Sequence, residues 1–358
     1  MKLDERSSAR LDALRFPLIV GVVFIHAYHA QIGMATGSVG VPESGFLSDF
    51  IRTLISQGVA RIAVPLFFIM SGYFLFWGFS WSILNYKKKI CSRIKSLLIP
   101  FLFWNCVTLA FIALAQSIPA TQVFFSGRIP SLFSLDAYGY VNVIFGIEQL
   151  PIAYHFWFIR DLMVLCLFMP VIFFFIKFMP LVSVVFILPL WIFDFIPLSE
   201  QSSLSVTFFL LGACLGYSKI DLFLLDRYEA FIFPTYISLL IFDALTKGMW
   251  FNGPIHNISV IVGCLVVLCL SRFLISPTRV RGFFAWASGA SFFIFAAHEP
   301  LLTVLRKVAF KTFAPSTDAA VLFLYFFVPT MVISFLGFVY FCMKRYAPKI
   351  LAMISGGR

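Results

Sequence analysis

The residues best suited to chemistry in this sequence are an arginine and a histidine in its first apolar segment. Arg15 and His26 are eleven residues apart, about three helical turns, so in a helix both side chains project from nearly the same face, roughly 16 Å apart along its axis. The residues from Phe16 to Ile25 between them are all apolar apart from one glycine and one proline. A cation and a titratable imidazole are both costly in hydrocarbon, and such residues mark functional paths in membrane proteins. The pair therefore indicates a polar path running into a membrane.

Each member of this pair has a possible chemical role. A histidine in a medium of low dielectric tends to be neutral, and a neutral imidazole can accept a proton as a general base. Arg15 can hold a phosphate or pair with Asp12, which lies three residues earlier on the same helical face. The alternative is that Arg15 anchors the helix at the membrane boundary and His26 is a packing residue.

Polar residues also interrupt two later apolar segments. Arg61 precedes the segment that contains Ser71, whose hydroxyl can bind the backbone or a substrate, although small residues there also suit close helix packing. Arg160 and Asp161 are neighbours at the start of another segment. We expect each of them to pair with some group, because an unpaired charge at that depth is costly.

Near the end of the ninth apolar segment, His298 and Glu299 precede Pro300. We expect both to lie near the outer end of one helix, where a bond to a neighbouring helix explains them as well as a role at a substrate does. Asp194 and Asp243 fall near the ends of segments, and we expect them to be solvated.

A basic stretch follows the second apolar segment and contains no acidic residue; it consists of Lys87, Lys88, Lys89 and Arg93, followed by Lys95. Such a stretch sets the topology of a membrane protein and attracts anionic lipid. A second interpretation is a docking surface for the phosphates of a polyanionic cytoplasmic donor.

Composition excludes a water-soluble protein. The 358 residues are 61% hydrophobic and 12% charged, too few charges to cover so much apolar side chain. The net charge of +11 could suggest nucleic acid, but here it fits basic cytoplasmic loops, so we expect no nucleic-acid partner. The seven cysteines show no CxxC or Cys/His spacing; we expect packing residues and no metal site.

Ten apolar segments predict an all-α integral membrane protein, a bundle of about ten transmembrane helices. The segments are roughly 14–32, 60–78, 97–116, 155–176, 181–197, 203–218, 229–247, 256–275, 283–304 and 320–343. If they alternate from a cytoplasmic N-terminus, nineteen of the 27 basic residues face the cytoplasm, which predicts both termini inside; the cluster from Arg306 to Lys311 argues against this locally. We expect residues 1–358 to form a single membrane domain with no appended soluble domain.

Together these segments resemble the membrane acyltransferase family 3, the inner-membrane O-acyltransferases of bacterial surface polysaccharides and related glycans. The resemblance extends from residue 11 to about residue 304. It is carried by Leu11-Asp12-Ala13-Leu14-Arg15 followed by His26, by Phe67-Phe68-Ile69-Met70-Ser71-Gly72-Tyr73, by Trp157-Phe158-Ile159-Arg160-Asp161-Leu162, and by the segment from Ser291 to His298. Residue 13 is alanine where the family often has glycine, and residue 16 is phenylalanine where a glycine is common.

The resemblance implies a reaction and roles for its residues. It implies acyl-CoA, usually acetyl-CoA, as a co-substrate from the cytoplasm, with no bound cofactor, and a sugar hydroxyl as acceptor. By position, His26 is then the candidate catalytic base, Arg15 the partner that orients donor or intermediate, and Ser71 a member of the family's Phe-Phe-x-x-Ser-Gly pattern. The polar residues left over, which are candidates for substrate binding, are Asp12, Arg61, Arg160, Asp161, His298 and Glu299.

Two other functions use the same residues. A transporter or flippase for a glycan or lipid would need intramembrane charges, but the ten segments show no inverted repeat with paired broken helices. A structural subunit of a polysaccharide export complex explains the apolar bulk but not the combination of Arg15, His26 and the Arg160–Asp161 pair.

Overall fold

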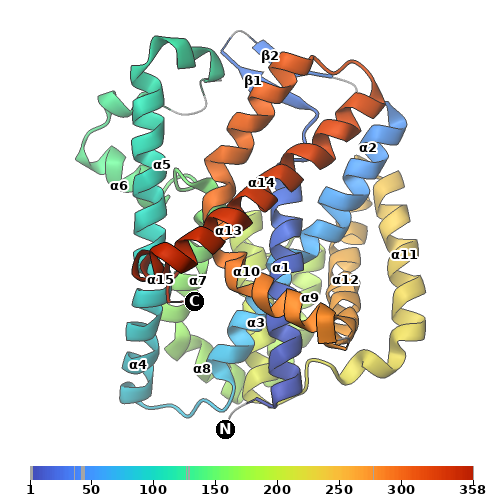
Figure 1. The fold of residues 1–358 in the computed structure, drawn as a ribbon. Coiled ribbons are helices and arrows are strands. Elements are labelled where there is room, and N and C mark those ends of the chain that lie inside the picture. Colours follow the sequence, from blue (N-terminus) through green and yellow to red (C-terminus); the bar gives the residue numbers. More distant parts are fainter. Residues whose placement is uncertain are drawn as a thin grey trace. The chain divides into compact units, whose positions relative to one another are not determined.

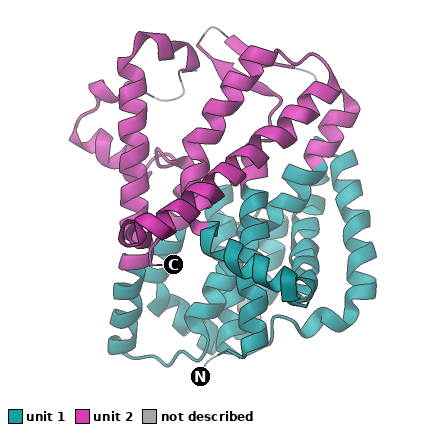
Figure 2. Cartoon of the chain, viewed as in Figure 1, with its two compact units in different colours: residues 1–22, 54–94, 161–291 teal, residues 23–53, 95–160, 292–358 magenta. Residues whose placement is uncertain are grey.

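The chain folds into two compact units, each built from three separate stretches of sequence (Figure 2). Unit 1 comprises residues 1–22, 54–94 and 161–291, and unit 2 comprises residues 23–53, 95–160 and 292–358. A computed structural model describes residues 3–35, 37–41, 45–125, 127, 130–276 and 278–357, apart from the side chains of 181–183. Within these residues the fold is helical, with one short hairpin of two antiparallel strands.

The helices and strands are labelled in Figure 1. Unit 1 holds α3 (Ala63–Phe76), α4 (Ile83–Arg93), α8 (Met169–Phe178), α9 (Pro180–Ile192), α10 (Glu200–Tyr217), α11 (Glu229–Leu245) and α12 (Asn252–Ile275). Unit 2 holds β1 (Gln31–Met34), β2 (Gly37–Gly40), α2 (Phe46–Arg52), α5 (Ile99–Ser117), α6 (Ala137–Phe145), α14 (Asp318–Tyr346) and α15 (Pro348–Ile354). Both units contain residues of α1 (Glu5–His26), α7 (Trp157–Leu167) and α13 (Thr278–Phe313). Short 3-10 or π-helical turns are Thr53–Val59, Ala60–Ile62, Ile94–Leu98, Pro119–Phe124, Leu132–Ser134, Tyr154–Phe156 and Leu224–Tyr228.

The protein is a multi-pass integral membrane protein. Six helical stretches of the described chain are long and apolar enough to cross a membrane, or seven if the bent pair formed by Tyr154–Leu167 and Met169–Phe178 is one span. Large apolar side chains are exposed along these stretches, among them Phe178 on α8 and Phe231 on α11, and lipid rather than water suits such a surface. Each of the ten predicted segments contains a helix. A count of ten spans and cytoplasmic termini stay predictions.

Three predicted segments end or bend where the pattern of apolar residues gave no sign of it. The first ends at His26 instead of continuing to residue 32. The fourth bends by 67° between α7 and α8, where Pro170 lacks the N–H that a continuous helix needs. In the ninth, Glu299 has non-helical angles (φ −107°, ψ 139°), because a residue before proline avoids the α region. The helix is therefore broken at Glu299, with His298 in the turn before the break.

In unit 1, α3 and α10 pack closely through glycines. A Cβ atom added at Gly72 would meet the backbone of Phe209, and one added at Gly212 or Gly216 would meet the backbone of Ile69 or Tyr73. Small residues let helix backbones approach in this way inside membranes. The packing interpretation of the Ser71–Gly72 segment is therefore confirmed for Gly72.

In unit 2, a buried amide fixes the turn that precedes α7. The side-chain carbonyl of Asn105, fully buried on α5, accepts a hydrogen bond of 3.2 Å from the backbone N–H of Ala153. This bond holds the Tyr154–Phe156 turn against α5 and so positions Tyr154 and His155.

Candidate active site

Three histidines lie together in unit 2, and we call them the histidine cluster. They are His26 at the end of α1, His155 in the turn before α7, and His298 on α13, just before its break. The rings of His26 and His298 are stacked with centroids 5.3 Å apart, and the rings of His155 and His298 are 4.7 Å apart. His26 and His298 were predicted as site residues, and the structure brings them together.

The break in α13 accounts for the orientation of His155. Pro300 has no N–H, so the carbonyl of Ala296 lacks its usual helical donor, and His155 Nε2 lies 3.3 Å from that oxygen. His298 Nδ1 lies 2.6 Å from the carbonyl oxygen of Phe295. A carbonyl only accepts, so both of these ring nitrogens carry protons. The other two, His155 Nδ1 and His298 Nε2, are buried without a hydrogen-bond partner among the residues that the structure describes.

Exposure separates His26 from the other two members of the cluster. The exposed fraction of His298 is 0% and that of His155 is 2%, whereas His26 is only half-buried. Within the cluster, His26 is therefore the one residue that is not fully buried.

A tyrosine connects His26 to a buried carboxylate. The hydroxyl oxygen of Tyr154 lies 3.1 Å from His26 Nδ1 and 3.0 Å from Glu299 Oε1, and the hydroxyl donates to the carboxylate. Glu299 Oε2 accepts a second hydrogen bond, of 3.3 Å, from the backbone N–H of Thr303. We call Glu299, Tyr154 and His26 the Tyr154 relay. Tyr154 was not predicted from the sequence, in which its position next to His155 is the one signal for it.

Two buried arginines hold the backbone around His26. Arg306 donates to the carbonyl oxygen of His26 over 2.9 Å and also to that of His29. Arg52 donates to the carbonyl oxygen of Tyr28 over 2.5 Å. Carbonyls at the end of a helix lack partners within it, and cations are favourable there. Arg306, which the sequence suggested as a topology charge, thus fixes the end of α1.

The other predicted residues of the first two segments lie in unit 1. Arg15 forms the expected ion pair with Asp12, with 2.8 Å between Nη2 and Oδ1. Arg61 donates to the side chain of Gln57 over 2.8 Å, and Ser71 is half-buried on α3. Arg15 and His26 share helix α1, as predicted, but belong to different units. Roles for Arg15, Arg61 and Ser71 at a substrate stay predictions.

Arg160 and Asp161 each find a partner, as expected. Arg160 donates over 2.6 Å to the carbonyl oxygen of Gly146, the residue that ends α6. In unit 1, Asp161 accepts a hydrogen bond of 2.6 Å from the hydroxyl of Ser205 on α10. These contacts are structural, and substrate binding by either residue stays a prediction.

The basic stretch lies on α4, and its members differ in their surroundings. Lys87 and Lys88 are exposed, and Arg93 is half-buried. Lys89 donates over 3.1 Å to the carbonyl oxygen of Leu75, near the end of α3. Lys89 therefore ties α4 to α3, and Lys87, Lys88 and Arg93 are the better candidates for donor phosphates.

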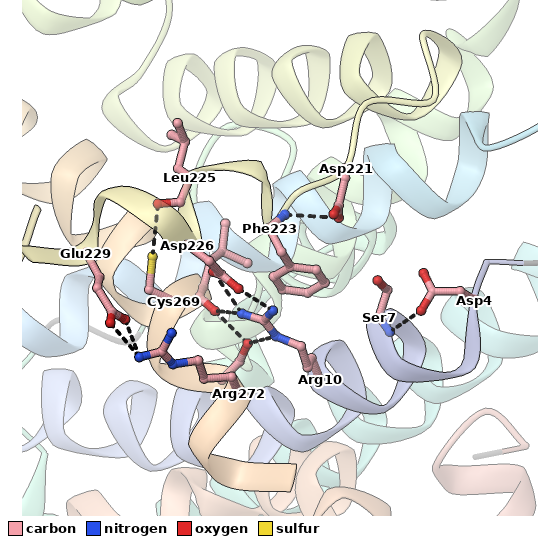
Figure 3. Close-up of polar contacts among 12 residues, drawn as sticks. Asp4, Ser7, Arg10, Asp221, Phe223, Leu225, Asp226, Glu229, Cys269 and Arg272 are labelled. Atoms are coloured by element: carbon pink, nitrogen blue, oxygen red, sulfur yellow. Dashed lines mark hydrogen bonds and ion pairs between the residues drawn. The ribbon is translucent and has the colours of Figure 1, made fainter. Parts of the chain in front are cut away.

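Unit 1 also contains a buried network around Arg10, shown in Figure 3. The guanidinium of Arg10, 4% exposed, pairs with both oxygens of Asp226 at 2.6 and 3.0 Å and lies 3.6 Å from the ring centre of Phe223. It also donates to the hydroxyl of Ser271 and the carbonyl of Leu268, both over 2.7 Å. The N–H groups of Arg10 thus bond to other groups of the protein, and the network joins α1 to α12 and to the turn before α11.

In unit 1, the imidazole of His256 contacts a carboxylate directly. His256 Nδ1 on α12 lies 2.9 Å from Asp243 Oδ2 on α11, and the amide of Asn252 donates to Asp243 Oδ1 over 3.0 Å. Asp243 is only 6% exposed, so the expectation that it is solvated is wrong. Among the described residues, no three His, Cys, Asp or Glu side chains are grouped to hold a metal ion.

Comparison with known proteins identifies the family. Residues 8–341 match a family model described as an acyltransferase domain, Acyl_transf_3. The chain is 27% identical over 368 residues to the succinoglycan biosynthesis protein ExoH of Rhizobium meliloti (strain 1021), covering 99% of this chain and 94% of that protein. No solved structure gives a significant match. Because the family model spans nearly the whole of a chain built from membrane helices, the protein belongs to the acyltransferase family 3 and is a membrane acyltransferase.

Proposed function

We propose that this acyltransferase, in the bacterial cytoplasmic membrane, moves an acyl group from cytoplasmic acyl-CoA to a hydroxyl of a lipid-linked or exported glycan, with His26 as general base. The family supports acyl transfer. The name of the relative ExoH connects that protein with the synthesis of a glycan, which supports a glycan acceptor here.

The observation that carries the role of His26 is its combination of exposure and fixed orientation. It is the accessible member of the histidine cluster, its ring contacts Tyr154, and its carbonyl is bonded to Arg306. A base must hold a constant geometry toward the proton that it removes, so these contacts are the ones a catalytic imidazole needs.

In the proposed reaction, His26 accepts the proton of the acceptor hydroxyl while the oxygen of that hydroxyl attacks the thioester carbonyl carbon. The tetrahedral oxyanion then collapses, the carbon–sulfur bond breaks, and the protonated imidazole returns its proton to the departing CoA thiolate. The products are an O-acylated glycan and free CoA. A covalent variant, in which Ser71 or His26 first carries the acyl group, balances in two such steps.

For the donor we propose the basic residues of unit 1. Lys87, Lys88 and Arg93 supply positive charge for the phosphates of acyl-CoA, and Arg15 orients the donor or the intermediate. Acetyl-CoA is the first donor to test.

The test is acyl transfer by the purified protein in lipid vesicles, with radiolabelled acetyl-CoA and a panel of longer acyl-CoA donors, and with lipid-linked glycan from the source cells as acceptor. We expect label in ester linkage to the glycan, and we expect His26→Ala and Arg15→Ala to abolish it at normal protein levels. His256→Ala is the matched control, because it removes another carboxylate-bonded imidazole, and it should retain activity. Full transfer by His26→Ala would refute its role. Movement of glycan across the vesicle membrane without acylation would favour a transporter.

A further inference from the structure

We infer that Tyr154 is a positioning residue that connects the charge of Glu299 to His26 and selects the tautomer in which the lone pair of His26 is on Nε2. The inference rests on the proposed role of His26 as base. It adds a residue and a reactive atom that no family resemblance supplied.

The single proton of the Tyr154 hydroxyl decides the direction of both of its hydrogen bonds. A phenol has one proton to donate, and Tyr154 donates it to Glu299 Oε1 over 3.0 Å. Toward His26 Nδ1, 3.1 Å away, the hydroxyl oxygen then accepts. His26 Nδ1 therefore carries the ring proton, and in the neutral imidazole the lone pair is on Nε2.

The surroundings of Glu299 favour its acceptor role in this relay. Each of its carboxylate oxygens accepts a hydrogen bond, from Tyr154 and from the backbone N–H of Thr303. Arg306, a buried cation, follows on the same helical stretch seven residues later. Because both of its oxygens accept hydrogen bonds, Glu299 is the accepting end of the relay.

The break in α13 gives this arrangement its geometry. The backbone leaves helical angles at Glu299, so Glu299 does not continue the helical turn that carries His298. The ring of His298 stacks on that of His26 with an interplanar angle of 28°. This stacking restricts rotation of the His26 ring and keeps Nδ1 toward Tyr154.

The same relay gives the imidazolium formed during catalysis a fixed counter-charge. When Nε2 takes the acceptor proton, Nδ1–H strengthens its bond to Tyr154, whose hydroxyl is bonded to Glu299. Orientation of a catalytic histidine by a carboxylate is a general device, and here a tyrosine stands between the two groups.

The test combines a tautomer-locking residue with a tyrosine variant. Nδ1-methylhistidine at position 26 keeps a lone pair on Nε2 but cannot donate to Tyr154, and its methyl group needs the space that the hydroxyl occupies. Tyr154→Phe vacates that space but leaves the normal histidine without its partner. We expect Tyr154→Phe to lower kcat about 10- to 100-fold, with the KM for acyl-CoA changed less than about twofold.

The decisive measurement is the double variant. We expect Nδ1-methylhistidine at 26 together with Tyr154→Phe to be more active than either single change, a rescue that loss of a merely structural hydrogen bond would not show. If the double variant is no more active than the single changes, Nδ1 is the reactive nitrogen or Tyr154 serves structure alone, and the inference is wrong.

Two further variants separate the relay from the fold and from the proposed function. Glu299→Gln keeps an acceptor for the tyrosine but removes the charge, and it should lower kcat about 10-fold or more at unchanged protein yield. Tyr138→Phe is the control: it removes a tyrosine–carboxylate hydrogen bond of 2.9 Å to Glu148, also in unit 2, and should keep full activity. Full activity of Tyr154→Phe with an inactive His26→Ala would overturn the relay alone, whereas an active His26→Ala would overturn the base itself.

Discussion

Arg306 donates a hydrogen bond of 2.9 Å to the backbone carbonyl of His26, although 280 residues separate them in the chain. The bond completes the last turn of α1 at the point where the helix stops, and a second one reaches the carbonyl of His29. The candidate base His26 is therefore supported by a cation that bonds its backbone carbonyl. This relationship makes Arg306 a determinant of the site without a place in the reaction.

Arg306→Met should destabilise the protein by roughly 2–4 kcal/mol, because the carbonyls of His26 and His29 lose a charged donor from a buried side chain while the volume is kept. Acyl transfer should fall with it, since the end of α1 is released. The stability of Arg306→Lys, which keeps one compact ammonium, should lie between that of Arg306→Met and that of the wild type. Thermal unfolding in detergent checks the order, with the exposed Lys344→Ala as control. Equal stability of Arg306→Met and wild type would contradict this assignment.

The Arg10 network predicts strong coupling between its two charges. Arg10→Met should cost about 3–5 kcal/mol because Asp226 then keeps an uncompensated charge, and Arg10→Lys should also be costly since it cannot bond both oxygens. Arg10→Met combined with Asp226→Leu should be more stable than Arg10→Met alone. Unfolding midpoints of the four proteins form a double-mutant cycle, and simple additivity would refute the coupling.

The contact between α3 and α10 predicts a clear contrast among glycines. Gly212→Ala and Gly72→Ala should both destabilise the protein, because the added methyl group meets the backbone of the facing helix. Gly337→Ala on α14 meets no atom within 4 Å, so alanine there should be neutral or stabilise by about 0.5–1 kcal/mol. The thermal stability of the three variants tests this contrast. A neutral Gly212→Ala would show that α3 and α10 can move apart to accommodate a methyl group without loss of stability.

Substitutions of the lysines of α4 should have different effects, on donor binding for the exposed ones and on stability for Lys89. Lys87→Ala with Lys88→Ala should raise the KM for acyl-CoA about 3- to 10-fold, with kcat nearly unchanged, and weaken its dependence on salt. Lys89→Ala should instead lower stability, because it removes the bond to the Leu75 carbonyl. Steady-state kinetics at two salt concentrations measure the first effect. An unchanged KM would assign the exposed lysines to topology or lipid contact.

Asp4 predicts a small dependence of stability on pH. The hydrogen bond of 2.9 Å from the backbone N–H of Ser7 lowers the pKa of Asp4 below its ordinary value of 3.8. Since the folded-state pKa is the lower one, the stabilisation is present above the unfolded-state value and is lost as the pH falls through the folded-state pKa. Asp4→Ala should thus cost roughly 0.5 kcal/mol at neutral pH, at the low end for a helix cap because Asp4 is exposed. The difference in unfolding free energy between Asp4→Ala and wild type should shrink toward pH 3. A difference independent of pH would show that the charge of the Asp4 carboxylate does not provide the stabilisation.

Much of the fold followed from local features of the sequence. A helix that crosses a membrane must be apolar over about 20 residues whatever its neighbours are, so each of the ten predicted segments could be found from composition alone. The Asp12–Arg15 pair was equally local, because it depends only on spacing within one helix. His26, His298 and Glu299 were recognisable because titratable residues in apolar segments are rare.

Other features depended on contacts between distant segments. Helix breaks at Phe168 and Glu299 left little sign in the apolar pattern, since proline acts on the backbone of its neighbours and not on hydropathy. Asp243 looked solvated because its partner, His256, belongs to the next helix.

By itself, then, the sequence determined a helical membrane acyltransferase and the chemical types of its candidate site, because apolar length and local motifs need no partner to be read. Only the tertiary structure decided that Tyr154 lies between His26 and Glu299 and that Arg306 holds the end of α1. These four residues come from three separate parts of the chain, since Glu299 and Arg306 both belong to α13. No spacing relates His26, Tyr154 and α13, because hydrogen bonds between distant segments depend on where each helix ends and how each turn directs its side chains.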